Sequence, residues 1–298
     1  QFLDFCGVED MAALHDKTAA DPAWFWGSAI KFLDVQFYEP YQQVLDLSDG
    51  IQHPKWCLGG KTNVVLNCLD KHRSTSAWNK TYLVWEGEDG EKREFSYADF
   101  DAEVCRFAGA LRAQGIGRGD VVAMFVPMIP EAMTSFFGIL KVGAIVLPLF
   151  SGFGPEPLRV RLGDSEARAV VTADGGPRRG TASPMKSILD EALLDCPSVT
   201  DVFVVRRMGN AVDCPMLTGR DHWWHEALAP HPSEAETERT DAEEIGFLVY
   251  TSGTTGKPKG VLMSHVGSVT KLALDICVTF DLGADDRMLW ISDMGWVV

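Results

Sequence analysis

The order of apolar and polar residues divides the chain into two regions. Up to about residue 70 the sequence is rich in aromatic side chains, and its apolar residues follow neither a helical nor a strand period for long. From about residue 80, apolar residues alternate between the 3.6-residue period of amphipathic helices and short continuous runs typical of strands covered on both faces. We expect an irregular first region, whose aromatic residues either pack against a neighbouring domain or stack a cofactor, with packing favoured.

The second region predicts regular elements in alternation. A helix should begin after Ser96, which has Asp99 at capping-box spacing, and end near Gly115. Further helices are expected at 130–144, 156–163, 184–194 and 264–280, and strands at 120–127, 145–150, 167–173, 200–206, 244–251 and 287–292. This alternation predicts an α/β fold with a doubly wound, mostly parallel sheet and helices on both faces.

A glycine-rich segment, "YTSGTTGKPKG" at 250–260, directly follows one predicted strand. Ligands of parallel sheets bind at the carboxyl ends of strands, and backbone N–H groups of a tight glycine turn can form an anion-binding nest. The added hydroxyls and lysines favour a loop that holds phosphates. It is not the common P-loop, because two residues separate Gly253 from Gly256 and Pro258 follows Lys257.

Composition restricts the possible partners. The 298 residues suffice for one large domain or two smaller ones, and the net charge of −15 argues against nucleic acid as a partner.

No apolar run is long enough to cross a membrane, and no signal peptide is visible after Gln1. The seven cysteines include no C-x-x-C pair, which fits a reducing compartment such as the cytoplasm and predicts neither a zinc site nor disulfides.

Several segments together resemble one family. The stretch "YTSGTTGKPKGVLMSH" resembles the signature loop of the AMP-forming acyl-CoA synthetases, within the adenylate-forming superfamily. The stretches "KWCLGGKTNVVLNCLDKH" and "VVRRMGNAVDCPMLTGRDHWWHE" are similar to the acetyl-CoA synthetase-like subgroup. The resemblance covers nearly the whole chain and implies an N-terminal cap at 1–72, followed by the N-terminal part of an AMP-binding adenylation domain at 73–298.

This resemblance implies a ligase that uses ATP, Mg²⁺ and coenzyme A with a small carboxylic acid. The carboxylate attacks the α-phosphate of ATP, pyrophosphate leaves, and the CoA thiol then displaces AMP to give a thioester. The residues implied to contact the ATP phosphates are Thr251, Ser252, Gly253, Thr254, Thr255, Gly256 and Lys257.

The resemblance also implies a CoA site. Acetyl-CoA synthetases present two arginines, three residues apart, to the 3′-phosphate of CoA, and Arg178 matches the first of them. The second position is Thr181 here, which departs from the pattern and puts CoA as the acceptor in doubt; Arg179 is the alternative. Gly152 and Gly154, within "FSGFGPE", resemble the family's glycine turn near CoA.

The end of the chain resembles a segment that lines the acid pocket. The residues implied to form this lining are Trp296, Val297 and Val298. Acetate-specific members typically have Thr at the last of these positions, so the Val predicts an acid other than acetate. Arg220 and Asp221, with Trp223 and Trp224, are either a ligand clamp or structural packing, and packing is favoured.

The family's later segments are not found in this sequence. It has no aromatic-Gly-x-Thr-Glu segment, no ribose-binding Asp and no small C-terminal domain with its lysine. We therefore assign no catalytic or metal-binding residue here, name a missing C-terminal portion as a partner, and expect the chain alone to be nearly inactive. Luciferases and peptide-synthetase adenylation domains share the loop but lack the cap. A noncatalytic nucleotide-binding module is the alternative from another class, and the loop spacing argues against a phosphate-loop kinase.

Overall fold

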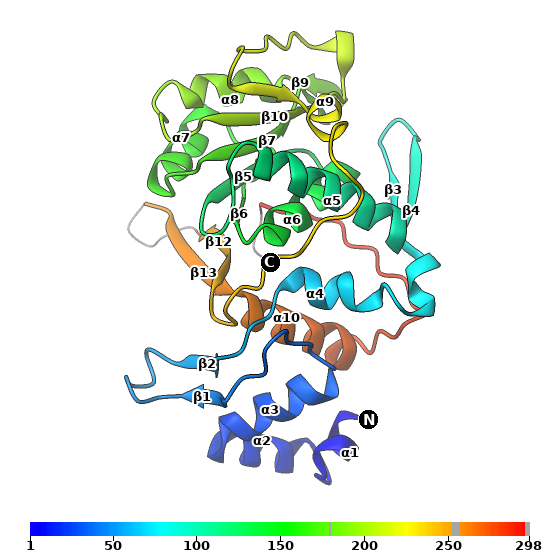
Figure 1. Ribbon diagram of the computed structural model, residues 1–298, viewed down its shortest axis with the longest axis vertical. Helices are drawn as coiled ribbons and strands as arrows, with labels where there is room; N and C mark the ends of the chain where they lie inside the picture. The colour runs from blue at the N-terminus through cyan, green and yellow to red at the C-terminus, as the bar shows by residue number, and fades with distance from the viewer. Residues whose placement is uncertain (179, 252–256, 296–298) are drawn as a thin grey trace. The chain divides into compact units, whose positions relative to one another are not determined.

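The computed structural model describes residues 1–178, 180–251 and 257–295 (Figure 1). The chain forms two compact units. The first, called here the cap unit, comprises Gln1–Lys71, Arg239–Ile245 and Met263–Trp290. The second, called the sheet unit, comprises His72–Glu238, Gly246–Leu262 and Ile291–Val298. Both units therefore contain segments that lie far apart in the sequence.

The sheet unit is organised by a central sheet with the strand order β11-β10-β7-β5-β6-β12-β13. Its strands are β5 (Val121–Phe125), β6 (Ile145–Pro148), β7 (Ala169–Ala173), β10 (Asp201–Val205), β11 (Asp221–Trp223), β12 (Ile245–Thr251) and β13 (Lys259–Ser264). The neighbours from β11 through to β12 pair in parallel. The predicted α/β fold with a mostly parallel sheet is confirmed.

Helices cover both faces of this sheet, because successive strand residues point to opposite sides. On one face, α7 (Pro155–Asp164) and α8 (Met185–Leu193) share a buried cluster with Ala123, Phe125 and Val170. On the other face, Phe107 of α5 (Tyr97–Ala113) packs edge-to-face on Phe203 of β10, with ring centroids 5.4 Å apart. The helices α6 (Pro130–Lys141) and α9 (Trp224–Leu228) both pack against α5.

Short elements complete the sheet unit. Two antiparallel hairpins are formed by β3 (Thr81–Glu86) with β4 (Lys92–Ser96), and by β8 (Gly176–Arg178) with β9 (Thr181–Ser183). The 3₁₀ turns are η2 (Ser76–Asn79) and η3 (Gly209–Ala211). The predicted capping box at the start of α5 is present, since Ser96 Oγ accepts the Asp99 N–H at 3.1 Å and the Asp99 carboxylate accepts the Ser96 N–H.

The strand predicted at 287–292 is wrong. No strand among the described residues pairs with them, and the residues Leu289 and Ile291 are 82% and 90% exposed. A continuous apolar run indicates a need for burial, whereas a strand also needs a neighbouring strand for its backbone hydrogen bonds.

The cap unit contains more helix than predicted. Its elements are α1 (Phe2–Cys6), α2 (Met11–Ala20), α3 (Pro22–Phe32), β1 (Gln43–Asp46), β2 (Lys55–Leu58), α4 (Val64–Cys68), α10 (His265–Leu274) and the π-helical turn η4 (Asp275–Thr279); the 3₁₀ turn η1 (Asp70–His72) lies at its boundary. The expectation of an irregular first region is wrong because two aspartates cap helices: Asp10 accepts the Ala13 N–H at 2.8 Å, and Asp21 accepts the Trp24 N–H at 2.9 Å.

The aromatic residues of the cap unit pack against one another. Phe2 contacts Phe25 and Phe32 edge-to-face, with centroids 5.9 and 5.1 Å apart, and Trp26 contacts Trp56 at 6.0 Å. Such offset geometries are the favoured ones for buried rings. These contacts lie within the cap unit, and the predicted packing against a neighbouring domain stays a prediction.

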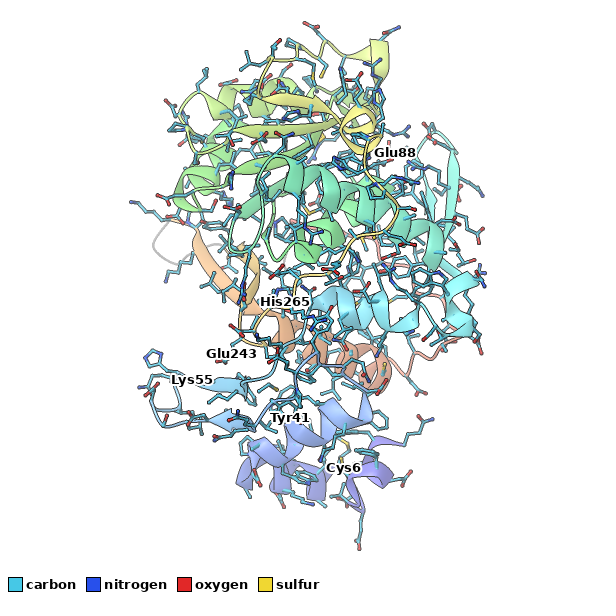
Figure 2. The ribbon with its side chains drawn as sticks, in the orientation of Figure 1. Cys6, Tyr41, Lys55, Glu88, Glu243 and His265 are labelled. Carbon is cyan, nitrogen blue, oxygen red and sulfur yellow. The ribbon has the colours of Figure 1, made fainter. Side chains whose placement is uncertain are left out.

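One buried polar group in the cap unit is incompletely paired. His265, at the start of α10, is fully buried, and its Nδ1 accepts the Val64 N–H at 3.3 Å (Figure 2). Its Nε2 has no hydrogen-bond partner among the residues that the structure describes. Burial lowers the pKa of His265 to about 4, so the ring is neutral near pH 7.

Candidate functional site

The segment after β6 meets the last described residues of the chain. Ser151 donates from its N–H at 3.2 Å and from its Oγ at 2.5 Å to Asp293 Oδ2. Gly295 lies so close to Phe150 that an added Cβ would be 2.0 Å from the Phe150 backbone nitrogen. The residues just before the predicted acyl pocket therefore lie against the loop after β6. Trp296, Val297 and Val298 themselves lie outside the described residues.

Two of the predicted CoA residues lie together. Arg178 ends β8, and its guanidinium occupies the space where a side chain at position 152 would begin, since a Cβ on Gly152 would lie 2.3 Å from Arg178 Nη1. The same guanidinium lies over the Phe150 ring, 5.3 Å from its centroid. In the described part of the chain no carboxylate pairs with Arg178. The absence of a Cβ at Gly152 is what permits this approach.

The other predicted CoA residues are not part of this contact. Gly154 is the N-cap residue of α7 with an ordinary φ of −84°, and nothing lies within 4 Å of a Cβ built on it. Thr181 Oγ1 donates to the Arg178 carbonyl at 2.9 Å and so closes the β8–β9 turn. Arg179 lies outside the described residues.

The strand that precedes the predicted phosphate loop ends at the same edge of the sheet. β12 ends at Thr251 and pairs in parallel with β6, with Phe247 opposite Val146, so both strands deliver their following loops to the carboxyl edge. Lys257 is exposed, and β13 begins two residues later. Ser252, Gly253, Thr254, Thr255 and Gly256 lie outside the described residues.

Three residues that sequence reasoning missed are in contact near the end of β12. The Tyr250 hydroxyl donates to Asp164 Oδ2 at 2.5 Å, and burial together with this carboxylate raises the pKa of Tyr250. The Arg161 guanidinium lies 5.7 Å from the centroid of the Tyr250 ring, and burial lowers the pKa of Arg161. Only the position of Tyr250, directly before the loop, offered a signal in the sequence.

The arginine and aspartate of "GRDHWWHE" belong to an internal ion cluster. The side chains of Lys186 and Asp221 are fully buried and lie 2.7 Å apart. Arg220 pairs with Asp190 at 2.5 Å and with Asp221 at 2.6 Å. Burial alone would raise the pKa of Asp221, but hydrogen bonds from Arg220 and Lys186 hold it below its ordinary value. Trp224 stacks on Phe107 with centroids 4.5 Å apart. These contacts support structural packing rather than a ligand clamp.

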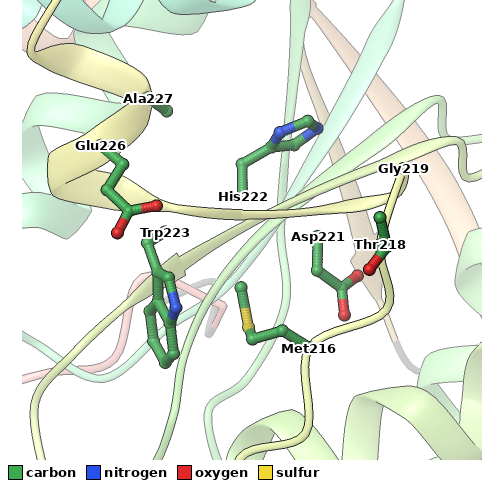
Figure 3. Close-up of a pocket in the computed structure, with 8 residues that line it drawn as sticks. All are labelled: Met216, Thr218, Gly219, Asp221, His222, Trp223, Glu226 and Ala227. Atoms are coloured by element: carbon green, nitrogen blue, oxygen red, sulfur yellow. The ribbon is translucent and has the colours of Figure 1, made fainter.

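A cavity of about 370 Å³ lies beside this cluster at the edge strand β11 (Figure 3). It is lined by Met216, Thr218, Gly219, Asp221, His222, Trp223, Glu226 and Ala227. The buried lining carboxylate is already engaged, because Asp221 Oδ2 accepts from Lys186 and from the Leu217 N–H at 2.8 Å. The Trp223 ring is covered by the Arg206 guanidinium at 4.3 Å.

The described residues give three further observations on cofactors and setting. They contain no group of three or more His, Cys, Asp or Glu side chains arranged to hold a metal ion. None of their helices combines the length and the apolar character that a membrane crossing requires. The seven cysteines are all unpaired.

Comparison with known proteins identifies the relatives of this chain. The family model for AMP-binding enzymes matches residues 69–298, and the model for the acetyl-coenzyme A synthetase N-terminus matches residues 11–68. An acetyl-coenzyme A synthetase from Gemmatimonas aurantiaca is 42% identical over 289 residues, covering 96% of this chain and 44% of the relative. One from Chlorobaculum tepidum is 36% identical over 290 residues, covering 97% of this chain and 43% of the relative.

A solved structure agrees with these matches. Acetoacetyl-CoA synthetase from Streptomyces lividans superposes with a TM-score of 0.86 at 26% identity, covering 97% of this chain and 43% of that protein. The chain thus spans less than half the length of its relatives and corresponds to their N-terminal portion. The resemblance to AMP-forming acyl-CoA synthetases is confirmed. The chain belongs to the family of AMP-binding enzymes.

Proposed function

We propose that this chain is the N-terminal portion of an ATP-dependent carboxylate–CoA ligase that forms an acyl-adenylate and then an acyl-CoA thioester. One observation carries the proposal. The end of β12 at Thr251 and the Arg178–Gly152 contact beside β6 belong to the carboxyl edge of one parallel sheet, in a chain 42% identical to an acetyl-coenzyme A synthetase.

The first step needs a phosphate clamp. A carboxylate oxygen bonds to the α-phosphorus, the bond to the bridging oxygen of the β-phosphate breaks, and pyrophosphate leaves. We assign Thr251, Lys257 and the five residues between them to the β- and γ-phosphates. Backbone N–H groups, hydroxyls and a lysine charge in this loop would hold the leaving pyrophosphate, and such preorganised electrostatics supply most of the catalysis in phosphoryl chemistry.

The second step needs a place for CoA. The thiol sulfur bonds to the acyl carbon, the carbon–oxygen bond to AMP breaks, and the thiol proton passes to solvent. We assign Arg178, Gly152, Gly154 and Arg179 to CoA, with Arg178 on the 3′-phosphate. A cation that no described carboxylate neutralises, in a chain with net charge −15, supports this assignment because it supplies positive charge locally.

The remaining assignments are less specific. Trp296, Val297 and Val298 would line the acid pocket, and Val298 favours an acid other than acetate. Mg²⁺ would accompany ATP, but the described residues gather no acidic cluster for it, so no step is assigned to a metal ligand here. The unpaired cysteines support a reducing compartment such as the cytoplasm.

The test is a product analysis of the natural protein that contains this sequence. With ATP, CoA and a panel of short carboxylic acids, we expect acid-dependent AMP and pyrophosphate. Formation of ADP, or ATP binding without turnover of any acid, would refute the ligase; the latter would favour a noncatalytic nucleotide-binding module. The 298-residue chain alone should give almost no AMP, because the family's late lysine lies outside it. If acetate has the highest kcat/KM in the panel, the Val298 proposal is wrong.

A further inference from the structure

The carboxylate of Asp293 holds the middle of the loop after β6. Its Oδ2 accepts from the Ser151 N–H at 3.2 Å and from the Ser151 Oγ at 2.5 Å, and its Oδ1 accepts the Gly295 N–H at 2.8 Å. Hydrogen bonds to a carboxylate are stronger than those between neutral groups. One side chain therefore joins two segments of the sheet unit that lie 142 positions apart in the sequence.

The two ends of this loop are held by other contacts. The Leu149 N–H donates to the Met124 carbonyl of β5 at 2.9 Å, and the Phe153 N–H donates to the Phe150 carbonyl at 3.0 Å. The Phe153 ring packs against the buried cluster that α7 and α8 share with the sheet. Between these anchors the loop is held by the Asp293 carboxylate, which accepts a backbone N–H that would otherwise need water or another partner.

The side chain of Arg178 rests on this same part of the loop. Its guanidinium lies 5.3 Å from the centroid of the Phe150 ring, and a Cβ on Gly152 would lie 2.3 Å from its Nη1. Phe150 and Gly152 are the direct neighbours of Ser151. A backbone shift at position 151 would therefore move both surfaces that the guanidinium contacts.

Gly295 supports the loop at its backbone. A Cβ on Gly295 would lie 2.0 Å from the Phe150 nitrogen and 2.2 Å from the Leu149 carbonyl carbon, so only a residue without a side chain fits here. The hydrogen bond from the Gly295 N–H to Asp293 fixes this close approach. Asp293 thus binds the loop through one oxygen and, through the other, fixes the backbone against which the loop lies.

We propose that Asp293 is a positioning residue for the CoA site: by holding Ser151, it keeps the loop after β6 in the conformation that seats Arg178 for the 3′-phosphate of CoA. The proposal rests on the proposed function, in which Arg178 contacts that phosphate. In this role Asp293 touches no ligand and acts through the loop. A guanidinium binds phosphate in a defined planar geometry, and such contacts depend on the hydrogen bonds that lock their surroundings.

The test compares CoA with 3′-dephospho-CoA as acceptors in the natural protein that contains this sequence. The measured quantity is kcat/KM for CoA divided by kcat/KM for 3′-dephospho-CoA, at saturating ATP and acid. Changes in the use of acid or ATP affect both acceptors equally and cancel in this ratio. The wild type should give a ratio of at least about 10, from one charge-assisted contact to the phosphate.

Two variants weaken the support of the loop to different degrees. Asp293→Ala removes all three hydrogen bonds and should lower the ratio about fivefold, because Arg178 remains but is no longer held in place. Ser151→Ala leaves the backbone N–H bonded to the carboxylate and should lower the ratio about twofold. Thermal unfolding of each variant establishes that it folds, and Ser151→Ala carries the test if Asp293→Ala does not fold.

A double-mutant cycle shows whether Asp293 acts through Arg178. Arg178→Gln removes the charge that distinguishes the two acceptors and should bring the ratio to about one. Adding Asp293→Ala to Arg178→Gln should then change the ratio no further. A purely structural defect would instead lower kcat/KM for both acceptors equally and leave the wild-type ratio intact.

The cap unit offers a matched control. Asp46 accepts the Ser48 N–H at 2.9 Å and the Ser48 Oγ at 3.1 Å, which is the same pair of serine–carboxylate bonds at a different place in the chain. Asp46→Ala should therefore leave the ratio unchanged. An equal fall of the ratio in Asp46→Ala and Asp293→Ala would mean that the loop after β6 has no special part in it.

The outcomes separate the two proposals. A natural protein that makes no acid-dependent AMP would contradict the proposed function, and the role of Asp293 would fall with it. The role of Asp293 alone is overturned, and the ligase proposal stands, if acyl-CoA forms without a preference for CoA over 3′-dephospho-CoA. The same conclusion follows if the folded Asp293→Ala and Ser151→Ala variants keep the wild-type ratio, or if Asp293→Ala lowers the ratio equally with and without Arg178→Gln.

Discussion

Two regions of the sheet unit contain arginines that the sequence offered as ligand contacts, and they differ in how the charge of the arginine is neutralised. At the edge strand β11, Arg220 pairs with Asp190 and Asp221, and the latter also pairs with buried Lys186. At the carboxyl edge of β6, Arg178 contacts a ring, and no carboxylate among the described residues pairs with it. The first arginine is neutralised within the protein, whereas the second has charge left for a ligand.

The ion pairs of an arginine distinguish a role in folding from a role in binding. Both regions looked suited to a ligand in the sequence, because both combine arginine with aromatic or glycine residues. A buried charge must be paired to be tolerated, so a closed ion cluster indicates folding first. A cation that lacks a counter-ion within the protein has its strongest interactions still to make, and phosphate is a ligand of matching geometry.

The largest expected effect comes from breaking the closed cluster. Asp221→Ala leaves the Lys186 ammonium fully buried with one carboxylate fewer, so we expect a loss of about 3–5 kcal/mol in the free energy of unfolding. Urea unfolding of the two chains measures the change. The double variant Lys186→Met/Asp221→Leu removes both charges and should recover much of the loss. If Asp221→Ala is as stable as the wild type, the cluster is not a folding element.

His265 of the cap unit is only partly paired. One of its ring nitrogens accepts a hydrogen bond, and the other has no partner among the described residues. Its pKa is about 4 in the folded chain and about 6.5 when unfolded, so the unfolded state binds more protons between these values. The contribution of His265 to the free energy of unfolding is therefore fully present above pH 6.5. It falls as the pH drops toward 4, by about 3 kcal/mol in total.

Urea unfolding between pH 7.5 and 4 measures this dependence. His265→Asn retains an acceptor for the Val64 N–H but does not titrate in this range. The variant should therefore show a flatter profile than the wild type over the same interval. Parallel profiles for the two chains would mean that another group causes the acid sensitivity.

Much of the fold could be predicted because the spacing of apolar residues indicates which faces of a helix or strand are buried. The helices α5 and α6 and the strands β5 and β7 are continuous segments with one or two covered faces, and the sequence shows this directly. The cap helices were missed although Asp10 and the Asp21–Pro22 pair are ordinary start signals, because abundant aromatic residues obscured the helical period. The strand at 287–292 failed because a local pattern does not reveal whether a neighbouring strand exists.

The candidate site could be predicted only where it is local. The glycine-rich segment carries its own signal in eleven residues. The contact of Arg161 with Tyr250 joins positions far apart in the sequence. The Arg178–Gly152 contact depends on the short β8–β9 hairpin, which the spacing of apolar residues did not predict. Such contacts require the topology of the sheet, because parallel strands bring distant loops to the same edge.

The unpaired cation should matter for binding and hardly at all for folding. If Arg178 contacts the 3′-phosphate, Arg178→Gln removes a charge-assisted hydrogen bond worth about 1.5–3 kcal/mol, and CoA affinity should fall at least tenfold. The affinity for 3′-dephospho-CoA should not change, and the free energy of unfolding should stay within about 0.5 kcal/mol of the wild type. Equal losses for both forms of CoA would place Arg178 elsewhere on the ligand.

The smallest expected effect tests the space that Arg178 occupies. In Gly152→Ala the new Cβ would lie 2.3 Å from Arg178 Nη1, and because the far end of a long side chain is what must move, stability should change by less than about 1 kcal/mol. The displaced guanidinium should weaken CoA binding about threefold, which corresponds to roughly 0.7 kcal/mol. Gly163→Ala, on α7, is the matched control, since nothing lies within 4 Å of its added Cβ and Gly163 is assigned to no ligand. If the two alanine variants bind CoA equally well, the position of Arg178 against Gly152 is irrelevant to the ligand, and the contrast between the paired and the unpaired arginine loses its functional meaning.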